Sequence, residues 1–573
     1  MARSLLLAVA CALLFLASSF ASAAVVEHTF TVQNLAVTRL CNQRVITAVN
    51  GKLPGPTLHV HEGDTVIIHV FNKSPYNITL HWHGVFQKLS GWADGPSMVT
   101  QCPIQPGHQY TYKFRIIKQE GTLWWHAHAS WLRATVYGAL IIRPKLGHSY
   151  AFPFPKPHKE IPIVLGEWWD ANPIDVENQA LATGAAPNNS DAYTINGLPG
   201  DLYKCSKNQT YVLNVKKGRT YLLRIINAAL NNQLFFKIAK HKMTVVAVDA
   251  GYTNPYVTNV VVIAPGQTVD VLLVANKPVG SYYMAARPYA SAPGVSFDNT
   301  TTRGIVGYDG AASTKTPKMP ALPAFNDTPT ANKFYTNLTG LVGGPHWVPV
   351  PTKVDKHMFI TVGLGLQACP KNTKCQGPNG TKFSASMNNA SFVLPTRLSM
   401  LQAFFSNVGG IYTTDFPSRP PIKLDYTNSN INNNNASLFA PKSTKVTKLK
   451  YNTTVEVVFQ DTAFIAVENH PMHIHGFNFH VLAQGFGNYD PSKHPSKHRK
   501  MFNLVNPHMR NTLAVPVGGW AVIRFRANNP GVWFTHCHLD VHFPWGLATA
   551  FVVENGPTPS TTLPPPPADM PQC

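Results

Sequence analysis

Residues 516–541 read PVGGWAVIRFRANNPGVWFTHCHLDV, and an earlier stretch, PGHQYTYKFRIIKQEGTLWWHAHASW (106–131), has the same arrangement. In both, a turn leads into an alternating strand, and Gly121 or Gly531 stands five residues before a His-x-His pair. A middle copy, PGQTVDVLLVANKPVGSYYMAARPY (265–289), keeps the turn, the strand and the glycine but has no histidine. Because internal similarity is the signature of repeated structural units, the chain is predicted to contain three related β-units.

Length and composition agree with this prediction. A chain of 573 residues is too long for one hydrophobic core and predicts about three or four domains. Runs rich in Val, Ile and Thr between turn residues, such as TVIIHVF (65–71) and TVEVVF (454–459), predict strands and an all-β fold. The Pro-rich stretch 311–330 has no periodic pattern and is predicted to be an exposed linker between the second and third units.

The first 24 residues have the layout of a cleavable signal peptide. A single Arg3 precedes an apolar run that ends near Phe15, and small residues follow up to Ala23. The run is well short of the ~20 residues that span a bilayer, and no later stretch reaches that length. We therefore expect a secreted protein that does not cross a membrane.

The net charge and the N-glycosylation sequons bear on the surroundings in which the protein works. The formal net charge of +21 favours polyanionic surroundings, although a basic surface that binds nothing is at least as compatible with it. No Lys/Arg cluster interleaved with aromatic residues points to nucleic acid. N-glycans are expected at some of the N-x-S/T sequons, which begin at Asn72, Asn77, Asn188, Asn208, Asn299, Asn326, Asn337, Asn379, Asn389, Asn435 and Asn452.

Cysteine usage singles out one thiol. Of eight cysteines, Cys11 leaves with the signal peptide, so seven remain in an oxidising compartment. An odd number leaves one thiol with another role, and Cys537, flanked by histidines, is the obvious candidate. The other six could form three disulfides in fifteen different ways.

Four short clusters carry the chemistry: HWH (His81, His83), HAH (His126, His128), HPMHIH (His470, His473, His475) and HCHLDVH (His536, Cys537, His538, His542). In a strand, residues i and i+2 point to the same face, so each His-x-His offers two imidazoles side by side. Pairs from the first and third units could meet across an interface and bind a shared metal cluster.

The same alternation turns Cys537 away from its two neighbours, His536 and His538. There it could bind a different metal together with His470 and His542, as in a blue-copper electron-transfer site. A lone His-x-His is more often a surface or packing feature than a ligand pair, but four clusters make coincidence improbable. Zinc sites usually take four ligands, often paired cysteines, whereas eleven ligand-type side chains here share one cysteine. Copper is therefore favoured.

The motifs H-W-H-G, H-x-H, H-P-x-H-x-H-G and H-C-H-x₃-H all match those of the multicopper oxidases, and the mature chain resembles the plant-type laccases. The resemblance implies three sequential cupredoxin-like Greek-key β-barrel domains, expected at 25–145, 158–310 and 346–573, with a linker at 311–345. It also implies four copper ions: one type 1, one type 2 and two type 3. The implied ligands are Cys537, His470 and His542 for type 1, His81 and His473 for type 2, and His83, His126, His128, His475, His536 and His538 for type 3.

The resemblance further implies a secreted, monomeric enzyme of the apoplast and cell wall, with acidic polysaccharides as its surroundings. It would oxidise small phenols, with monolignols and lignin as the implied substrate class, near His542. Electrons would pass through Cys537, His536 and His538 to dioxygen, which becomes water. This reduction requires protons, and the positions of Asp94 in GWADGP and Asp540 inside HCHLDVH suit them to supply protons, although as surface-loop acids both would be unremarkable. The implied disulfides are Cys41–Cys205 and Cys102–Cys573, which leaves Cys369–Cys375 by elimination.

Position 547 is where these oxidases place the axial residue of the type 1 site, and Leu547 cannot coordinate. Ascorbate oxidases, the nearest relatives by architecture, typically resemble the methionine form, so Leu547 favours a laccase over an ascorbate oxidase. A leucine there also predicts a high potential of the type 1 site. A metal-ion oxidase would need acids near His470 or His542, and no acid cluster is evident there in the sequence. A copper-less wall protein of the same fold is a third alternative, disfavoured by the intact ligand motifs.

Overall fold

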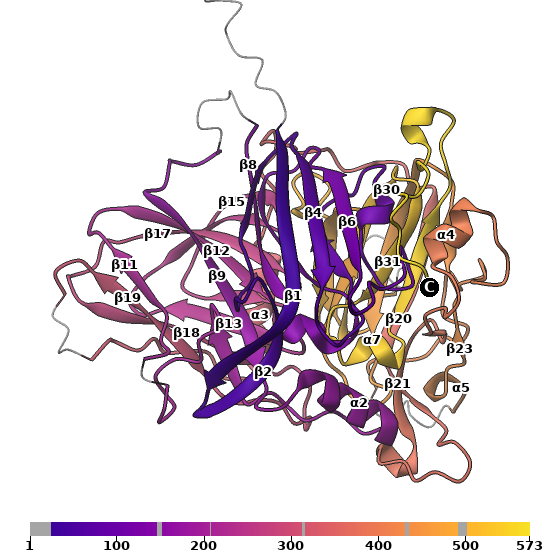
Figure 1. Ribbon diagram of the computed structural model, residues 1–573, viewed down its shortest axis with the longest axis horizontal. Coiled ribbons are helices and arrows are strands. Elements are labelled where there is room, and N and C mark those ends of the chain that lie inside the picture. Colours follow the sequence, from indigo (N-terminus) through magenta and orange to yellow (C-terminus); the bar gives the residue numbers. More distant parts are fainter. Residues whose placement is uncertain are drawn as a thin grey trace, which may run out of the picture.

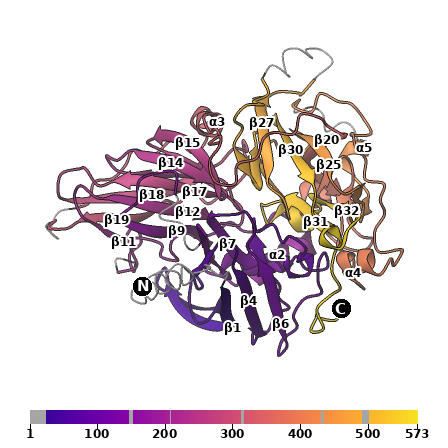
Figure 2. The ribbon, with the colours of Figure 1, turned by 90° about the horizontal axis from the view of Figure 1, so that it is seen from above.

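The computed structural model describes residues 24–145, 152–206, 208–311, 316–428, 430, 435–490 and 501–573. The signal peptide predicted over 1–24 lies outside the described residues except for its last position. Strands hold 42% of the chain and helices 9%, so the all-β prediction is confirmed. Three two-sheet units follow one another along the chain and pack around a common centre (Figure 1, Figure 2).

The first unit consists of two four-stranded sheets with strand orders β2-β1-β4-β6 and β3-β8-β7-β5. Its elements are β1 (Val25–Arg39), β2 (Asn42–Val49), β3 (Leu58–His61), β4 (Thr65–Asn72), β5 (Leu80–His83), η1 (Gly91–Ala93), β6 (Gln109–Arg115), β7 (Gly121–Ala127), η2 (Ser130–Ala134) and β8 (Tyr137–Arg143). β1 pairs in parallel with β4, although β2 and β3 lie between them in the chain. Strands that are neighbours in this sheet are thus not all consecutive in the chain, as in a Greek key.

The second unit has a six-stranded sheet, β10-β9-β12-β17-β14-β15, and a five-stranded sheet, β11-β19-β18-β13-β16. Its elements are β9 (Lys159–Trp168), α2 (Pro173–Thr183), β10 (Ala192–Ile195), β11 (Val212–Val215), β12 (Thr220–Asn227), β13 (Gln233–Ile238), β14 (Met243–Val248), β15 (Gly251–Thr258), β16 (Val261–Ile263), β17 (Thr268–Val274), β18 (Ser281–Tyr289) and β19 (Thr302–Tyr308). The Asn172 side chain caps α2, and Gly184 ends it in a left-handed conformation.

The third unit has sheets of order β21-β20-β25-β30-β27-β28 and β24-β32-β31-β26-β29, and a small β22-β23 pair. Its strands are β20 (Lys356–Gln367), β21 (Lys382–Met387), β22 (Ser391–Phe392), β23 (Lys442–Ser443), β24 (Thr447–Leu449), β25 (Thr453–Asp461), β26 (His470–Ile474), β27 (Phe479–Phe486), β28 (Met509–Arg510), β29 (Thr512–Val515), β30 (Gly519–Ala527), β31 (Gly531–Cys537) and β32 (Ala548–Val553). Its helices are η3 (Pro378–Gly380), α4 (Met400–Phe405), α5 (Asn435–Leu438), α7 (His542–Trp545) and η5 (Pro559–Thr561).

The repeat in the sequence corresponds to a repeat in the fold. Each copy supplies one strand to each sheet of its unit: β6 and β7, β17 and β18, and β30 and β31. Gly121 and Gly531 begin β7 and β31 with φ angles of 127° and 138°, which L side chains rarely adopt. This explains why a glycine precedes both His-x-His pairs at the same distance.

Three disulfides join the predicted partners: Cys41–Cys205, Cys102–Cys573 and Cys369–Cys375. The first connects units one and two, and the second ties the C-terminus to unit one. Cys537 is buried and free, so the prediction from the odd cysteine count is confirmed.

The linker predicted over 311–345 contains a helix, α3 (Thr328–Thr336), which the sequence pattern does not predict. The Asp327 side chain caps it, and Ala331, Phe334 and Tyr335 are buried against the core of unit two. Three apolar side chains among Pro, Thr and Asn residues give too weak a helical period to be recognised without the surface they cover.

Candidate metal centre

The His-x-His pairs lie on strands that face one another. β5 pairs antiparallel with β7, which puts His81 opposite His126. β26 pairs antiparallel with β31, which puts His473 opposite His536 and Met472 opposite Cys537. Units one and three therefore each present a buried patch of imidazoles, and the middle unit presents none.

These two patches meet. Three sets of ligand atoms lie within 4.8 Å of one another: His81, His83 and His473; His83, His126 and His538; and His128, His475 and His536. The distance is 3.2 Å between His538 Nε2 and His83 Nδ1, and also 3.2 Å between His475 Nε2 and His536 Nε2. All eight histidines of the predicted shared cluster are brought together.

The imidazoles are held in a state suited to metal binding. Burial lowers the pKa of seven of them, and the neighbouring imidazoles and Arg133 lower it further: His83, His126, His128, His473, His475, His536 and His538. Neutral imidazole is the form that offers a lone pair to a metal.

Backbone carbonyls fix the orientation of several rings. His81 Nδ1 donates to Asp94 O at 2.7 Å, and His473 Nδ1 donates to Asn511 O at 2.8 Å. The Nε2 atoms of both rings are buried and have no hydrogen-bond partner among the described residues. An oriented imidazole with a buried, unpaired second nitrogen is what a metal ligand requires, so the residues present fit a metal cluster.

A second group lies on the other face of β31. Cys537 Sγ is 3.7 Å from His470 Nδ1 and 3.6 Å from His542 Nδ1, and all three residues are buried. Burial raises the pKa of the Cys537 thiol, but the two histidines outweigh it and lower that pKa to about 7. The donor set, two imidazoles and one thiol of lowered pKa, is the one expected for a His₂Cys copper site.

Leu547 belongs to the same core as Cys537 and is fully buried. Its carbonyl accepts the Cys537 N–H at 3.0 Å. The side chain of Leu547 has no nitrogen, oxygen or sulfur atom that could coordinate a metal.

Two acids lie beside the histidines of the thiol group, where the sequence shows no cluster of acids. Glu468 Oε1 is 3.0 Å from His542 Nε2, and Asp461 Oδ1 is 3.5 Å from His470 Nε2. Glu468 stands two residues before His470 in AVENHPMH, and this spacing was the available signal. Asp461 ends β25, and only the tertiary fold brings it to His470.

The two acids singled out in the sequence lie at the eight-histidine cluster. Asp94 is fully buried, and its Oδ2 accepts from His475 Nδ1 at 2.9 Å. Asp540 Oδ1 pairs with Arg133 at 2.9 Å. Burial, opposed by Arg133, raises the pKa of Asp540 to about 7.

Arg133, which sequence reasoning missed, connects all three units. Its guanidinium donates to His538 Nδ1 at 2.9 Å and to the carbonyls of Ala229 and Leu230 in unit two, each at 3.1 Å. No motif marks it, because its role depends on the packing of η2 against the other units.

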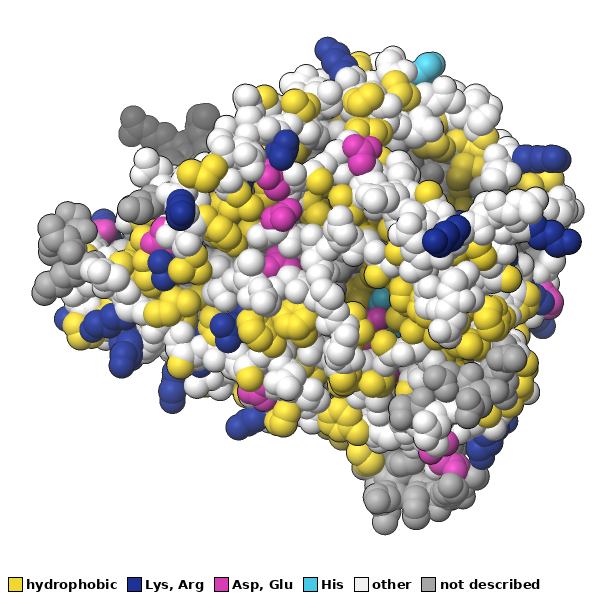
Figure 3. Space-filling view, turned by 90° about the horizontal axis from the view of Figure 1, so that it is seen from below, with side chains coloured by type: hydrophobic (Ala, Val, Ile, Leu, Met, Phe, Trp, Pro, Cys, Tyr) yellow, Lys and Arg dark blue, Asp and Glu magenta, His cyan; other side chains and the backbone are white. Residues whose placement is uncertain are grey.

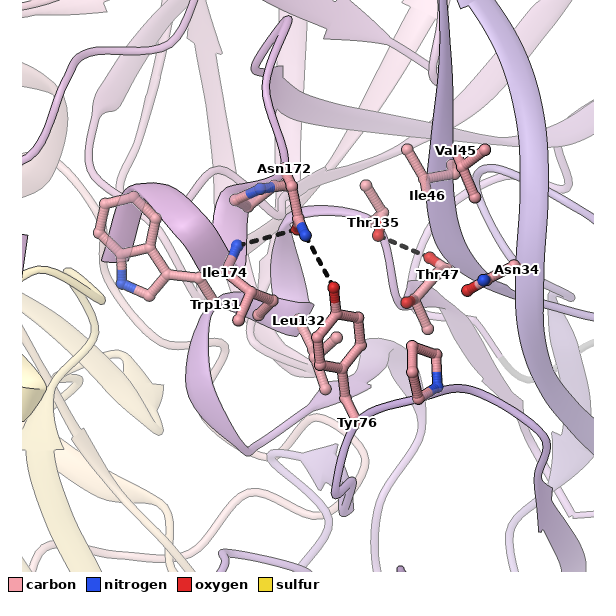
Figure 4. A pocket seen from close by; sticks show the side chains of 12 residues that line it. Asn34, Val45, Ile46, Thr47, Tyr76, Trp131, Leu132, Thr135, Asn172 and Ile174 are labelled. Carbon is pink, nitrogen blue, oxygen red and sulfur yellow. Dashed lines mark hydrogen bonds between the residues drawn. The ribbon is translucent and has the colours of Figure 1, made fainter. Parts of the chain in front are cut away.

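Two cavities among the described residues lie apart from the thiol group, because neither is lined by Cys537, His470 or His542. One of about 170 Å³ is lined by Tyr76, Trp131 and Asn172 among others, and contains no ligand histidine (Figure 4). Within it Asn172 donates to the Tyr76 hydroxyl at 2.7 Å (Figure 4). A smaller one of about 10 Å³ is lined by His126, His128 and Asp540, with Arg133 and Phe543 among the others. On the face in Figure 3, a hollow bordered largely by hydrophobic side chains shows a histidine and an acid on its floor.

Comparisons with known proteins agree with this geometry. Family models described as multicopper oxidase match residues 31–147, 159–311 and 415–557. The chain is 66% identical to Laccase-7 of Arabidopsis thaliana and 55% identical to Laccase-3 of Oryza sativa subsp. japonica, with 99% of each chain covered in both cases. The crystal structure of a laccase from Botrytis aclada has a TM-score of 0.72 at 26% identity, covering 96% of this chain and 90% of that one.

Proposed function

The chain belongs to the multicopper oxidase family and is a laccase, and from this premise we propose which of its side chains bind copper and what the acids beside them do. A laccase of this family binds four copper ions and oxidises phenolic substrates with dioxygen. When bound, the ions take up single electrons from phenols and pass four of them to dioxygen, which becomes two waters with four protons.

His470, Cys537 and His542 bind the type 1 ion in this proposal. His81 and His473 bind the type 2 ion, and the type 3 pair is held by His83, His126, His128, His475, His536 and His538. The observation that carries the assignment is the convergence of these eleven atoms into buried groups of three, with unpaired nitrogens on His81 and His473. Elemental analysis tests it directly: four copper atoms per chain are expected, and zero or two would contradict the assignment.

The chain connects the two copper sites through β31. Cys537 and its neighbours His536 and His538 point to opposite faces of the strand, so a few covalent bonds separate a type 1 ligand from two type 3 ligands. His536 Nδ1 also donates to Cys537 O at 2.9 Å, which adds a shorter second connection. An electron that enters at the thiol therefore leaves through either imidazole.

We place phenol oxidation at His542 and Glu468. Nδ1 of His542 faces the thiol, and Nε2 faces outward to Glu468, whose side chain is 17% exposed. Burial raises the pKa of the Glu468 carboxyl, but His542 outweighs it, and the net shift is downward. A carboxylate is thus available to accept the hydroxyl proton of a phenol, while His542 would provide the path by which its electron reaches the copper site.

Asp94 and Asp540 supply protons to dioxygen in this proposal. Asp94 touches His475 and holds His81 through its carbonyl, so it is in the cluster. Asp540 lines the small cavity with His126 and His128, and Arg133 holds it there. Because the pKa of Asp540 is raised to about 7, this acid holds a proton near neutral pH and can release it during dioxygen reduction.

Monolignols and related phenols are the proposed substrates, in lignin polymerisation or breakdown. We further propose a secreted, glycosylated monomer in the apoplast, surrounded by acidic wall polysaccharides that its basic charge would favour. No helix among the described residues is long and apolar enough to cross a membrane. The sequon at Asn72 is the exception to glycosylation, because its amide is buried and donates to the carbonyls of Tyr76 and Ile104.

Dioxygen uptake with a panel of phenols, a non-phenolic one-electron donor, ascorbate and Fe²⁺ tests the substrate proposal. Glu468→Gln should lower kcat/KM for phenols by about 100-fold, the scale of a lost general base, and spare the donor that has no proton to lose. Glu554→Gln, an exposed acid paired with Lys448, is the matched control. Equal losses on both donors would contradict the role of Glu468. Faster turnover of Fe²⁺ than of every phenol would favour a metal-ion oxidase instead.

A further inference from the structure

The histidine-free middle copy of the repeat lies against the eight-histidine cluster. Gly266, in its PGQT turn, has φ +90°, and a Cβ there would lie 2.9 Å from the His538 ring. Trp124 Nε1 donates to Gly266 O at 3.1 Å, and Gln267 Nε2 donates to Thr512 O at 3.0 Å. The turn of unit two therefore packs directly on parts of units one and three that carry the cluster.

Asp249 is the buried charge of this junction. Its Oδ1 accepts from Thr268 N at 2.9 Å, within unit two. Its Oδ2 accepts from Arg510 Nε at 3.0 Å and from the backbone N–H groups of Asn511 and Thr512 at 3.3 and 3.2 Å. A carboxylate that is 1% exposed thus joins unit two to three consecutive residues of unit three.

The backbone at Asp249 is strained. Asp249 and the following Ala250 have φ angles of 45° and 60°, in the tight turn between β14 and β15. Such turns usually contain glycine, and a left-handed residue other than glycine persists only where the surrounding structure enforces it. Gly121 approaches this turn so closely that a Cβ there would lie 2.9 Å from the Cα of Ala250. The strain is retained where three units meet.

The segment that Asp249 holds orients two histidines. Asn511 Oδ1 and Thr512 Oγ1 each lie 3.0 Å from His83 Nε2, and both can accept its proton. His473 Nδ1 is 2.8 Å from Asn511 O and 3.1 Å from Thr512 Oγ1. The two rings stack with centroids 3.9 Å apart. Their remaining nitrogens, His83 Nδ1 and His473 Nε2, are left for a metal.

We propose that Asp249 is a positioning residue for the trinuclear copper cluster. The middle unit, which supplies no ligand, uses this carboxylate to hold residues 510–512, and these residues hold the rings of His83 and His473. The inference rests on the proposed function, because it requires that these two histidines bind copper.

Asp249→Asn tests the proposal with a side chain of the same size and no charge. The amide cannot accept from Arg510, Asn511 and Thr512 as the carboxylate does, so His83 and His473 should be less well oriented. Residues behind metal ligands typically contribute 10–100-fold to metal affinity, so we expect the variant to lose type 2 copper to a chelator at about 10-fold lower chelator concentration. The type 2 electron paramagnetic resonance signal should change, and the visible band of the Cys537 site should not.

Glu456→Gln is the matched control, because Glu456 also pairs in the interior with an arginine, Arg524, outside the cluster. Type 2 copper loss equal in Asp249→Asn, Glu456→Gln and the unmodified protein would overturn the inference. So would loss of the Cys537 band together with type 2 copper, because it would indicate general unfolding. Should Asp249→Asn not fold, Arg510→Lys, which keeps the charge and loses the Nε bond to Asp249 Oδ2, decides the question by the same readouts. Absence of a type 2 signal in the unmodified protein would contradict the ligand assignment, not the role of Asp249.

Discussion

At the scale of single residues, Leu547 predicts the potential of the type 1 site. With leucine at this position, a type 1 ion held by Cys537, His470 and His542 would receive no ligand from residue 547, so its oxidised form would be less stabilised than with a thioether. Leu547→Met should lower the type 1 potential by about 59 mV for each tenfold stabilisation of the oxidised form. Redox titration of the visible band measures it. Leu449→Met, another buried leucine of the same core, should leave the potential unchanged, and an equal shift in both variants would contradict the axial role.

A substitution at Asp540 should affect only one of the two half-reactions, the reduction of dioxygen and not the oxidation of phenols. Asn is the same size but carries no transferable proton, so Asp540→Asn should slow reoxidation by dioxygen by about 100-fold and leave phenol-driven reduction of the blue centre intact. Stopped-flow measurements follow each half-reaction separately. Asp415→Asn, an exposed acid paired with Lys445, should change neither. Turnover unchanged in Asp540→Asn would remove the proton role.

At the scale of elements, the sequence predicted what depends on local periodicity. The two-residue alternation of a strand was enough to put His536 and His538 on one face of β31 and Cys537 on the other. The internal repeat was enough to predict three units, and the structure adds that each copy crosses from one sheet to the other.

What the sequence could not predict depends on tertiary packing. Asp249 reaches the metal centre from a segment distant in sequence from its histidines, whereas Arg133 and Asp461 follow His128 and precede His470 by five and nine residues, and no spacing rule connects any of the three to the histidines. Glu468 was within reach of sequence reasoning, because it lies two residues from His470. The sequence shows no cluster of acids there, whereas the fold brings together single acids from two segments.

At the scale of the whole molecule, the proposed copper ligands come from units one and three, so copper should contribute to the joint between them. Binding at 100 times the dissociation constant stabilises a folded protein by about 2.7 kcal/mol, and domains of 150–250 residues shift Tm by about 2–4 °C per kcal/mol. Copper removal should therefore lower Tm by about 5–10 °C, measured by calorimetry, and restored copper should reverse the change.

Hydrogen exchange should show where that stability resides. In the copper-free protein, amides of β5, β7, β26 and β31 should exchange faster, because these strands or the residues next to them carry the ligands and the buried imidazoles lose their shared partner. Amides of the β11-β19-β18-β13-β16 sheet, which carries no ligand, should exchange at unchanged rates. Uniformly faster exchange across all three units would mean that copper stabilises the molecule as one cooperative body. An unchanged pattern in β26 and β31 would contradict a structural contribution of the cluster at this interface.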